Sequence, residues 1–316
     1  HGRHPMPLPG TAPAKSGYPT VMPESPCSLN VGSVRVDAVV EVATVPLAFA
    51  DFLPASTPDA IAAEAHWLQP RFADASLKYG LLSFHTYVLR SDTCTILVDT
   101  CIGNDKDRGG HAGFHRLTTG WLRDLQQLGV APESVDYVMC THMHGDHVGW
   151  NTRLSNGRWV PTFPNARYVF ARSEFEHRAR LRETKPGGDY GVYADSILPV
   201  VESGQVDLVD SDHELEGLLR LEAAPGHTPG NVVIHLQPGR EHAVLSGDVI
   251  HHPLQVKYPE WSAAFCEDPA ASAACRRRFV EAHADTETLI LPAHFPAPTA
   301  GYIRSHGNRW RYSFAD

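Results

Sequence analysis

Alternating apolar and polar residues predict a β-strand near the start of the chain. Between residues 33 and 45, Val34, Val36 and Ala38 share one face, while Arg35 and Asp37 fall on the other. A period of two is the signature of a strand, because successive side chains point to opposite faces of a sheet. Residues 81–89 and 93–99 repeat this character, and the polar residues 90–92 between them indicate a hairpin.

Helical signals alternate with further strand signals along the rest of the chain. A helix over 57–68 is predicted to begin at Thr57, which offers a capping hydroxyl ahead of Pro58 and Asp59. A helix over 117–128 carries its apolar residues on one face and ends before a glycine. Further helices are predicted from a capping box at Ser173–Glu176 to about 182, and from 268 onward. Further strands are predicted over 135–140, 167–170, 218–223, 231–236, 243–245 and 288–292, with a closing hairpin over 302–314.

Segments without periodicity suggest the domain organisation. Residues 1–30 are rich in Pro, Gly and Ser, and we expect an extended N-terminal arm there, with a single mixed α/β domain over 31–316. The glycine-rich residues 102–116 are either a mobile loop beside a site or a solvated connection. Residues 183–193 form an insertion that we expect to lie over the site.

Composition narrows the class of protein. The 316 residues are 42% hydrophobic and 20% charged, as in an ordinary globular protein. The net charge of −9 argues against nucleic acid as a partner, and no apolar run reaches the ~20 residues of a membrane helix. We therefore expect a small-molecule partner and no membrane association, with a homodimer left open. We expect a cytoplasmic location, or a periplasmic or secreted one if a signal peptide was removed. Of the six cysteines, Cys94, Cys101 and Cys140 lie in or beside predicted strands and are expected to be buried free thiols, while the even count leaves disulfides open.

The densest chemistry lies at residues 141–147, Thr-His-Met-His-Gly-Asp-His, directly after the predicted strand 135–140. The carboxyl end of a strand is where an α/β sheet presents its chemistry. Neutral imidazole and carboxylate are ligands of zinc and similar metals. His142 and His144 project to one side of an extended loop, and Gly145 is expected to allow the turn that brings in Asp146 and His147. A solvated histidine-rich loop is the simpler alternative.

The His-x-His-x-Asp-His pattern resembles the signature of the metallo-β-lactamase superfamily. Later segments resemble the other family motifs in the family order: Pro-Gly-His-Thr-Pro-Gly at 225–230, Leu-Ser-Gly-Asp at 245–248 and Leu-Pro-Ala-His at 291–294. The resemblance covers about residues 80–310 and implies a four-layer αββα sandwich.

The resemblance also implies a ligand set for two divalent metal ions, with zinc first and manganese, iron or cobalt as alternatives. It assigns His142, His144 and His227 to one ion, Asp146, His147 and His294 to the other, and Asp248 as the bridge. Such a dinuclear hydrolase uses a metal-bridging hydroxide against an ester, lactone or phosphotriester. Asp146 would also orient the nucleophile and carry a proton to the leaving group.

The substrate is open at this stage. Residues 292–304 are similar to methyl parathion hydrolase and its relatives, and quorum-quenching acyl-homoserine lactonases are the other similar group. Apolar substrates need apolar walls, and the candidate substrate-binding residues are Phe114, Trp150, His252, Trp261 and Phe295. His251 is the alternative to His252 as the histidine that supports the site.

Other activities share the motif. Iron-dependent persulfide dioxygenases and glyoxalase-type enzymes have much of the same ligand set, and hydrolytic dehalogenation is chemically open. An RNA-processing nuclease is disfavoured by the acidic balance. A purely structural metal module is disfavoured because a structural site is closed by four ligands.

Overall fold

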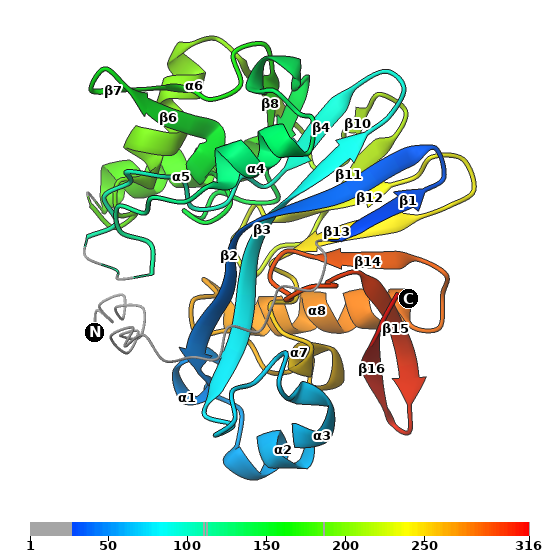
Figure 1. The fold of residues 1–316 in the computed structure, drawn as a ribbon. Helices are drawn as coiled ribbons and strands as arrows, with labels where there is room; N and C mark the ends of the chain where they lie inside the picture. Colours follow the sequence, from blue (N-terminus) through cyan, green and yellow to red (C-terminus); the bar gives the residue numbers. More distant parts are fainter. Residues whose placement is uncertain (1–26, 110, 112, 186, 316) are drawn as a thin grey trace.

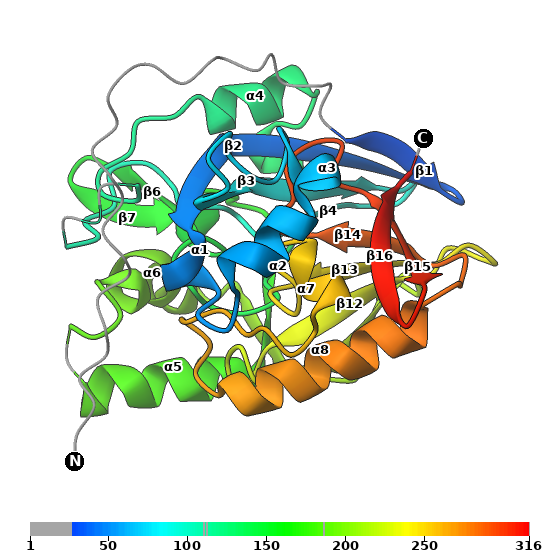
Figure 2. The same ribbon diagram turned by 90° about the horizontal axis from the view of Figure 1, so that it is seen from below.

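Two seven-stranded sheets pack face to face between helices in the computed structural model, which describes residues 27–109, 111, 113–185 and 187–315. Figure 2 shows helix α4 on one side of the sheets and α8 on the other. The predicted αββα sandwich is confirmed. Within the described ranges, no helix is long and apolar enough to cross a membrane.

The first sheet has the order β1-β2-β3-β4-β5-β8-β9 (Figure 1). Its strands β1 to β4 are antiparallel neighbours, whereas β4, β5, β8 and β9 run parallel. The parallel strands therefore direct their carboxyl ends to one edge. The bounds are Ser28–Val31 (β1), Val34–Ala48 (β2), Tyr79–Arg90 (β3), Thr95–Val98 (β4), Tyr137–Met139 (β5), Arg167–Ala171 (β8) and Val206–Val209 (β9).

The second sheet has the order β10-β11-β12-β13-β14-β15-β16. Its strands are antiparallel neighbours except for the parallel pair β13–β14, so β11, β13 and β14 all run in one direction. The bounds are Glu214–Leu215 (β10), Leu219–Ala223 (β11), Val232–Leu236 (β12), Ala243–Gly247 (β13), Leu289–Pro292 (β14), Gly301–His306 (β15) and Arg309–Phe314 (β16). A separate hairpin pairs β6 (Thr152–Ser155) with β7 (Arg158–Pro161).

Two of the helices have an N-terminal capping side chain at the predicted start, and the others begin elsewhere. Thr57 accepts a hydrogen bond from the Ala60 amide (3.2 Å), and Asp268 accepts one from the Ala271 amide (2.9 Å). The capping box at Ser173 is wrong, because that helix already begins at Arg172 and has no side-chain cap. The helix predicted from 117 begins at 121, and the one over 57–68 is divided at Glu64.

The helices are α1 (Phe49–Phe52), α2 (Pro58–Ala63), α3 (Ala65–Leu68), α4 (Trp121–Gln127), α5 (Arg172–Thr184), α6 (Leu198–Glu202), α7 (Leu254–Lys257) and α8 (Pro269–His283), with short 3-10 turns η1 (Pro132–Ser134) and η2 (Gly149–Asn151) and a π-helix η3 (Tyr193–Ile197).

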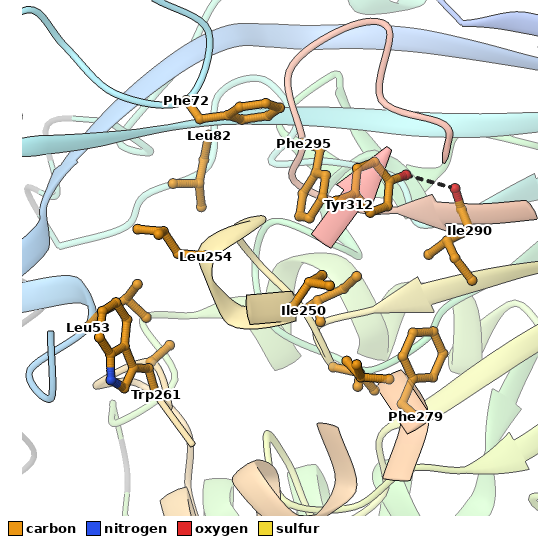
Figure 3. Packing of buried hydrophobic residues seen from close by; sticks show 14 of the residues in the cluster. Leu53, Phe72, Leu82, Ile250, Leu254, Trp261, Phe279, Ile290, Phe295 and Tyr312 are labelled. Carbon is orange, nitrogen blue, oxygen red and sulfur yellow. Dashed lines mark hydrogen bonds between the residues drawn. The ribbon is translucent and has the colours of Figure 1, made fainter. Parts of the chain in front are cut away.

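Three large buried clusters fill the spaces between the layers, and a smaller fourth one consists of Val45, Phe84 and Ile102. One contains Val36, Val98 and Leu245 and lies between the sheets, while another joins the first sheet to α4 through Trp121 and Leu125. The third joins the second sheet to α7 and α8, and Figure 3 shows its side chains. Burial of these apolar faces on both sides of each sheet holds the four layers together.

Strand β2 buries an acidic residue that the alternation pattern had placed on its polar face. Asp37 is buried and accepts hydrogen bonds from Ser28, Arg35 and Arg90. Ser28 belongs to β1, so the end of the predicted N-terminal arm is part of the first sheet, and residues 1–26 lie outside the described residues.

Candidate metal centre

All seven sequence-predicted ligands lie in loops that follow strands. His142, His144, Asp146 and His147 follow β5 of the first sheet. From the second sheet, the loops after β11, β13 and β14 bring in His227, Asp248 and His294. Because these strands end at a shared edge of the sandwich, residues more than 150 positions apart meet at one place.

The first donor set consists of His142, His144, His227 and Asp248. Nε2 of His142 lies 3.0 Å from Nδ1 of His144, and Nε2 of His227 lies 3.1 and 2.8 Å from these two atoms. Oδ2 of Asp248 is 3.1 Å from Nε2 of His227. Ligand nitrogens ~2.1 Å from a tetrahedral zinc ion stand ~3.4 Å apart, a few tenths of an ångström more than these spacings.

The second donor set consists of Asp146, His147 and His294. Oδ2 of Asp146 lies 3.7 Å from Nε2 of His147 and 3.8 Å from Nε2 of His294. The other oxygen of Asp248, Oδ1, lies 2.9 Å from Nε2 of His294 and 3.3 Å from Nε2 of His147. Asp248 therefore turns one carboxylate oxygen to each set.

In four of the histidines, Nδ1 makes a hydrogen-bond contact with an atom on the side of the ring away from the metal centre. These partners are Thr141 Oγ1 for His142 (3.2 Å), Asp99 Oδ2 for His147 (2.9 Å), Cys266 Sγ for His227 (3.5 Å) and Ser83 O for His294 (3.2 Å). The Thr141 hydroxyl donates to Asp99 (2.9 Å), so its oxygen is free to accept from His142. With the proton assigned to Nδ1 by these partners, each Nε2 directs a lone pair inward.

This donor arrangement fits a pair of metal ions. Nε2 of His147 and Oδ1 of Asp248 are buried and have no hydrogen-bond partner among the described residues. Burial holds the pKa of His142 well below its usual range, so its imidazole is neutral. Burial alone would raise the pKa of Asp248, but the neighbouring histidines, His294 foremost, hold it well below its usual range. Burial alone would lower the pKa of His147 and His227, but the Asp248 carboxylate raises that of His147 well above its usual range and that of His227 to about 9. A divalent cation would therefore displace protons from these two imidazoles when it binds.

Glu174 on α5 holds two of the ligand loops together. Its Oε1 accepts the amide of Met143 (3.0 Å), and its Oε2 accepts the Thr228 hydroxyl (2.7 Å) and the Gly230 amide (3.2 Å). Arg178, one turn further along the helix, lies 3.3 Å from the same carboxylate. A Cβ at Gly230 would lie 2.2 Å from the Glu174 amide nitrogen, so this approach requires glycine. The sequence analysis had no signal for this role of Glu174.

Gly145 is favoured for a different reason from the one predicted. Its φ is not in the left-handed region, so the turn does not need glycine. A Cβ there would instead lie 3.1 Å from Cγ2 of Val192 and 3.3 Å from Nε of Arg108. The ligand loop thus packs closely against neighbouring segments.

Three of the predicted pocket walls belong to the core. Trp150 is buried, stacks on Trp121 at 5.2 Å and donates from Nε1 to Glu41 (2.7 Å). Trp261 and Phe295 are buried in the cluster beneath the second sheet (Figure 3). Sequence alone does not distinguish a core aromatic residue from a pocket aromatic residue, since both follow the same hydrophobic pattern.

His252 also lies away from the centre. Its Nε2 pairs with the Phe72 carbonyl (2.8 Å) and its Nδ1 accepts the Leu254 amide (3.2 Å). Burial lowers the pKa of this histidine to about 4. Its ring packs edge-on against Phe49 and Phe52, so its contacts are those of a core residue.

Other aromatic side chains do flank the metal centre. Phe84 packs edge-on against His294 at 5.1 Å, and the predicted wall residue Phe114 packs on Phe84 at 5.3 Å. On the other side, the half-buried Phe265 lies 5.9 Å from the ring of His227. Phe84 and Phe265 were missed by the sequence analysis. Phe84 lies within a strand pattern, and Phe265 lies outside any recognised motif.

The loop over 102–116 is anchored by buried charges. Lys106 is fully buried, donates to the Thr152 hydroxyl (2.5 Å) and the Asp195 carbonyl (3.0 Å), and lies over the ring of Trp159. Arg108 forms a bidentate pair with the Asp195 carboxylate at 2.6 and 3.0 Å. These contacts attach the loop to the β6–β7 hairpin and to η3.

Replacing Lys106 by methionine is expected to remove a pH dependence of stability. Burial lowers the pKa of Lys106 from 10.5 to about 7, so between these values the unfolded chain binds more protons than the folded one. Rising pH therefore favours the folded state of the wild type in this window, and the variant loses that contribution. Urea unfolding of both metal-free proteins at pH 7 and pH 10 measures this, with the wild type gaining stability relative to the variant. A difference that is the same at both pH values would contradict the expectation.

Comparison with known proteins agrees with this geometry. The family model described as the metallo-beta-lactamase superfamily matches residues 80–294. An N-acyl homoserine lactonase, AttM, of Agrobacterium fabrum is 31% identical over 193 residues, which cover 59% of this chain and 68% of the relative. A probable metallo-hydrolase of Mycobacterium bovis is 24% identical over 246 residues, which cover 67% of this chain and 74% of the relative.

Solved structures show the same fold. AidC, a dizinc quorum-quenching lactonase in complex with its product N-hexanoyl-L-homoserine, superposes with a TM-score of 0.76 at 19% identity, covering 92% of this chain and 98% of its own. The hydrolase AbOPH of the β-lactamase superfamily superposes with a TM-score of 0.76 at 22% identity, covering 92% and 98%. At these identities the likeness establishes the fold alone.

Proposed function

The chain belongs to the metallo-β-lactamase superfamily, and from that premise we propose that it is a dinuclear metal-dependent hydrolase of lactones and related esters. The observation that carries the proposal is the placement of Asp248, with one oxygen toward each of two donor sets. A carboxylate in that position reduces the repulsion between two adjacent cations. Phosphotriesters are the second substrate class, since the same chemistry attacks carbonyl and phosphorus centres.

The two ions, most simply zinc, would be held by the two donor sets and would supply an activated water nucleophile and polarise the substrate oxygen. Asp146 is the more accessible of the two carboxylates, with 17% of its side chain exposed against 3% for Asp248. From this position Asp146 orients the nucleophile and carries a proton to the leaving group. Asp99 and Glu174 bind loop atoms rather than substrate and keep the donors in place.

The surroundings of the centre support an apolar acyl or aryl substituent on the substrate. Phe84 and Phe114 flank His294, and Phe265 flanks His227, so aromatic surface lies on both sides of the donors. Such side chains bind the apolar part of a substrate while polar groups hold the reacting part. The lactonase activity of relatives such as AttM points to the same class.

Removal of metal is expected to abolish hydrolysis, and its return to restore it. Elemental analysis of the purified protein should give about two divalent ions per chain, and dialysis against a chelator should remove turnover of a lactone, an aryl ester and a phosphotriester. The panel member with the highest kcat/KM identifies the substrate class. One iron per chain together with no hydrolysis would contradict the proposal and favour oxygenase chemistry.

A further inference from the structure

Arg276, near the middle of α8, is a fully buried cation. Its Nε donates to the carbonyl of Val249 (2.8 Å), and its Nη1 donates to the carbonyls of Pro259 (2.7 Å) and Trp261 (3.0 Å). Its Nη2 donates to the Ser272 hydroxyl (2.8 Å), so all these acceptors are uncharged oxygens. Burial of a cation without an opposite charge costs free energy, which a hydrophobic side chain of similar size at this position would avoid.

The three carbonyls belong to the loop that follows Asp248. Val249 comes directly after Asp248, whereas Pro259 and Trp261 come after the short helix α7. Arg276 therefore holds both ends of this loop against α8 through one planar group. A guanidinium presents its N–H groups in a rigid fork, so it fixes the relative positions of the carbonyls that accept from it.

Gln255 closes the same loop from inside. Its Nε2 donates to the Trp261 carbonyl (2.8 Å), and its Oε1 accepts the backbone amide of His251 (2.8 Å). Nε2 of His251 in turn lies 3.1 Å from Oδ2 of Asp248. The loop that Arg276 holds is thus in direct contact with the carboxylate that faces both donor sets.

The start of α8 packs against the other ligand loop of the second sheet, which makes the helix a fixed base. The Glu267 amide, just before the helix, donates to the carbonyl of His227 (2.9 Å). A Cβ at Gly226 would lie 2.2 Å from the Ser272 amide nitrogen, so this close approach requires glycine. One helix therefore holds the main chain of the His227 loop and, through Arg276, that of the Asp248 loop.

We propose that Arg276 is a positioning residue for the bridging carboxylate, which it fixes between the two donor sets by holding the Val249 carbonyl against α8. This inference rests on the proposed dinuclear centre. Arg276 acts through the main chain rather than by contact with a donor atom. Because Asp248 turns one oxygen to each set, a shift of its main chain weakens both sites, whereas a change confined to the His227 loop weakens the first site alone.

The test is the affinity of the full-length apoprotein for Zn²⁺, titrated against a chromophoric chelator. Arg276→Lys keeps the positive charge, but a single ammonium does not reproduce the fork of a guanidinium. We expect both ions to bind roughly 10–100-fold more weakly than in the wild type, the usual effect of losing a residue that orients metal ligands. Arg278→Lys makes the same chemical change at an exposed position of the same helix and should bind both ions as the wild type does.

Urea unfolding of the apoproteins separates positioning from a purely structural role. If Arg276→Lys is less stable but its folded form binds both ions within threefold of the wild type, the proposal is overturned. Weaker binding of only one ion also overturns it, because Asp248 faces both sets. Arg276→Met removes the buried charge together with the fork, and it should weaken both ions as well, which covers the case in which the lysine variant does not fold.

The wild-type titration distinguishes failure of this inference from failure of the proposed function. If the wild type binds fewer than two ions, the dinuclear proposal itself fails, and the role of Arg276 fails with it. If the wild type binds two ions and the folded Arg276 variants do too, with unchanged affinity, the dinuclear centre stands and only the positioning role is lost.

Discussion

Replacing Asp248 by asparagine is expected to lower kcat/KM by roughly 10³-fold, equivalent to about 4 kcal/mol of transition-state stabilisation. The amide has nearly the same shape as the carboxylate, so the loop after β13 should keep its conformation. It lacks the negative charge that lies between the two donor sets, where Oδ1 and Oδ2 each face different histidines. Without that charge, the repulsion between two adjacent cations is larger, and we expect fewer than two bound ions per chain.

Elemental analysis and steady-state kinetics on the same preparation measure both effects of Asp248→Asn. The matched control is Asp268→Asn, since asparagine caps a helix as well as aspartate does and α8 lies outside the donor sets. Two bound ions with turnover within tenfold of the wild type would show that Asp248 does not link the two sets.

Replacing Glu174 by alanine is expected to lower the free energy of unfolding by about 3–5 kcal/mol, because removing one partner of a buried ion pair leaves the other charge uncompensated. The variant leaves Arg178 without its carboxylate and leaves the amides of Met143 and Gly230 and the Thr228 hydroxyl without an acceptor. The loops that carry His144 and His227 also lose their common attachment, so metal affinity should fall as well.

Chemical denaturation of the metal-free Glu174→Ala protein separates stability from metal binding. Glu174→Gln keeps an acceptor oxygen and should lose less stability. Glu176→Ala, at an exposed position on the same helix, controls for helix propensity. A loss below about 1 kcal/mol in Glu174→Ala would mean that the loops are held by other contacts.

The predicted ligand loops lie together in the structure because each motif follows a strand. Val135 to Cys140 and the residues before Asp248 and His294 have clear strand patterns, and strand ends meet at one edge of such a sandwich. That Asp248 and His227 approach His142 was implied by the family resemblance, and the strand ends give the physical reason. Whether each of these atoms binds a metal stays a prediction that the experiments above test.

The residues around the ligands could not be predicted, because their roles depend on packing. Glu41 lies in an alternating strand pattern that suggests a solvent-facing acid, yet it accepts the amides of Ile102 and Gly103 and the indole of Trp150. The strand that carries it has register shifts, which change the face that its side chains occupy. Nothing in the pair His251–His252 indicates that the first ring faces the centre and the second faces Phe72.

The donors come from both sheets, which has a thermodynamic consequence for the intact molecule. His142 and His147 are attached to the first sheet, and His227, Asp248 and His294 to the second, so bound ions connect the two halves of the sandwich at one edge. Ions that bind only the folded chain add RT ln(1 + [M]/Kd) to its stability, about 2.7 kcal/mol for each site when free metal is a hundredfold above Kd. The population of folded enzyme in a cell would then rise and fall with the supply of free metal.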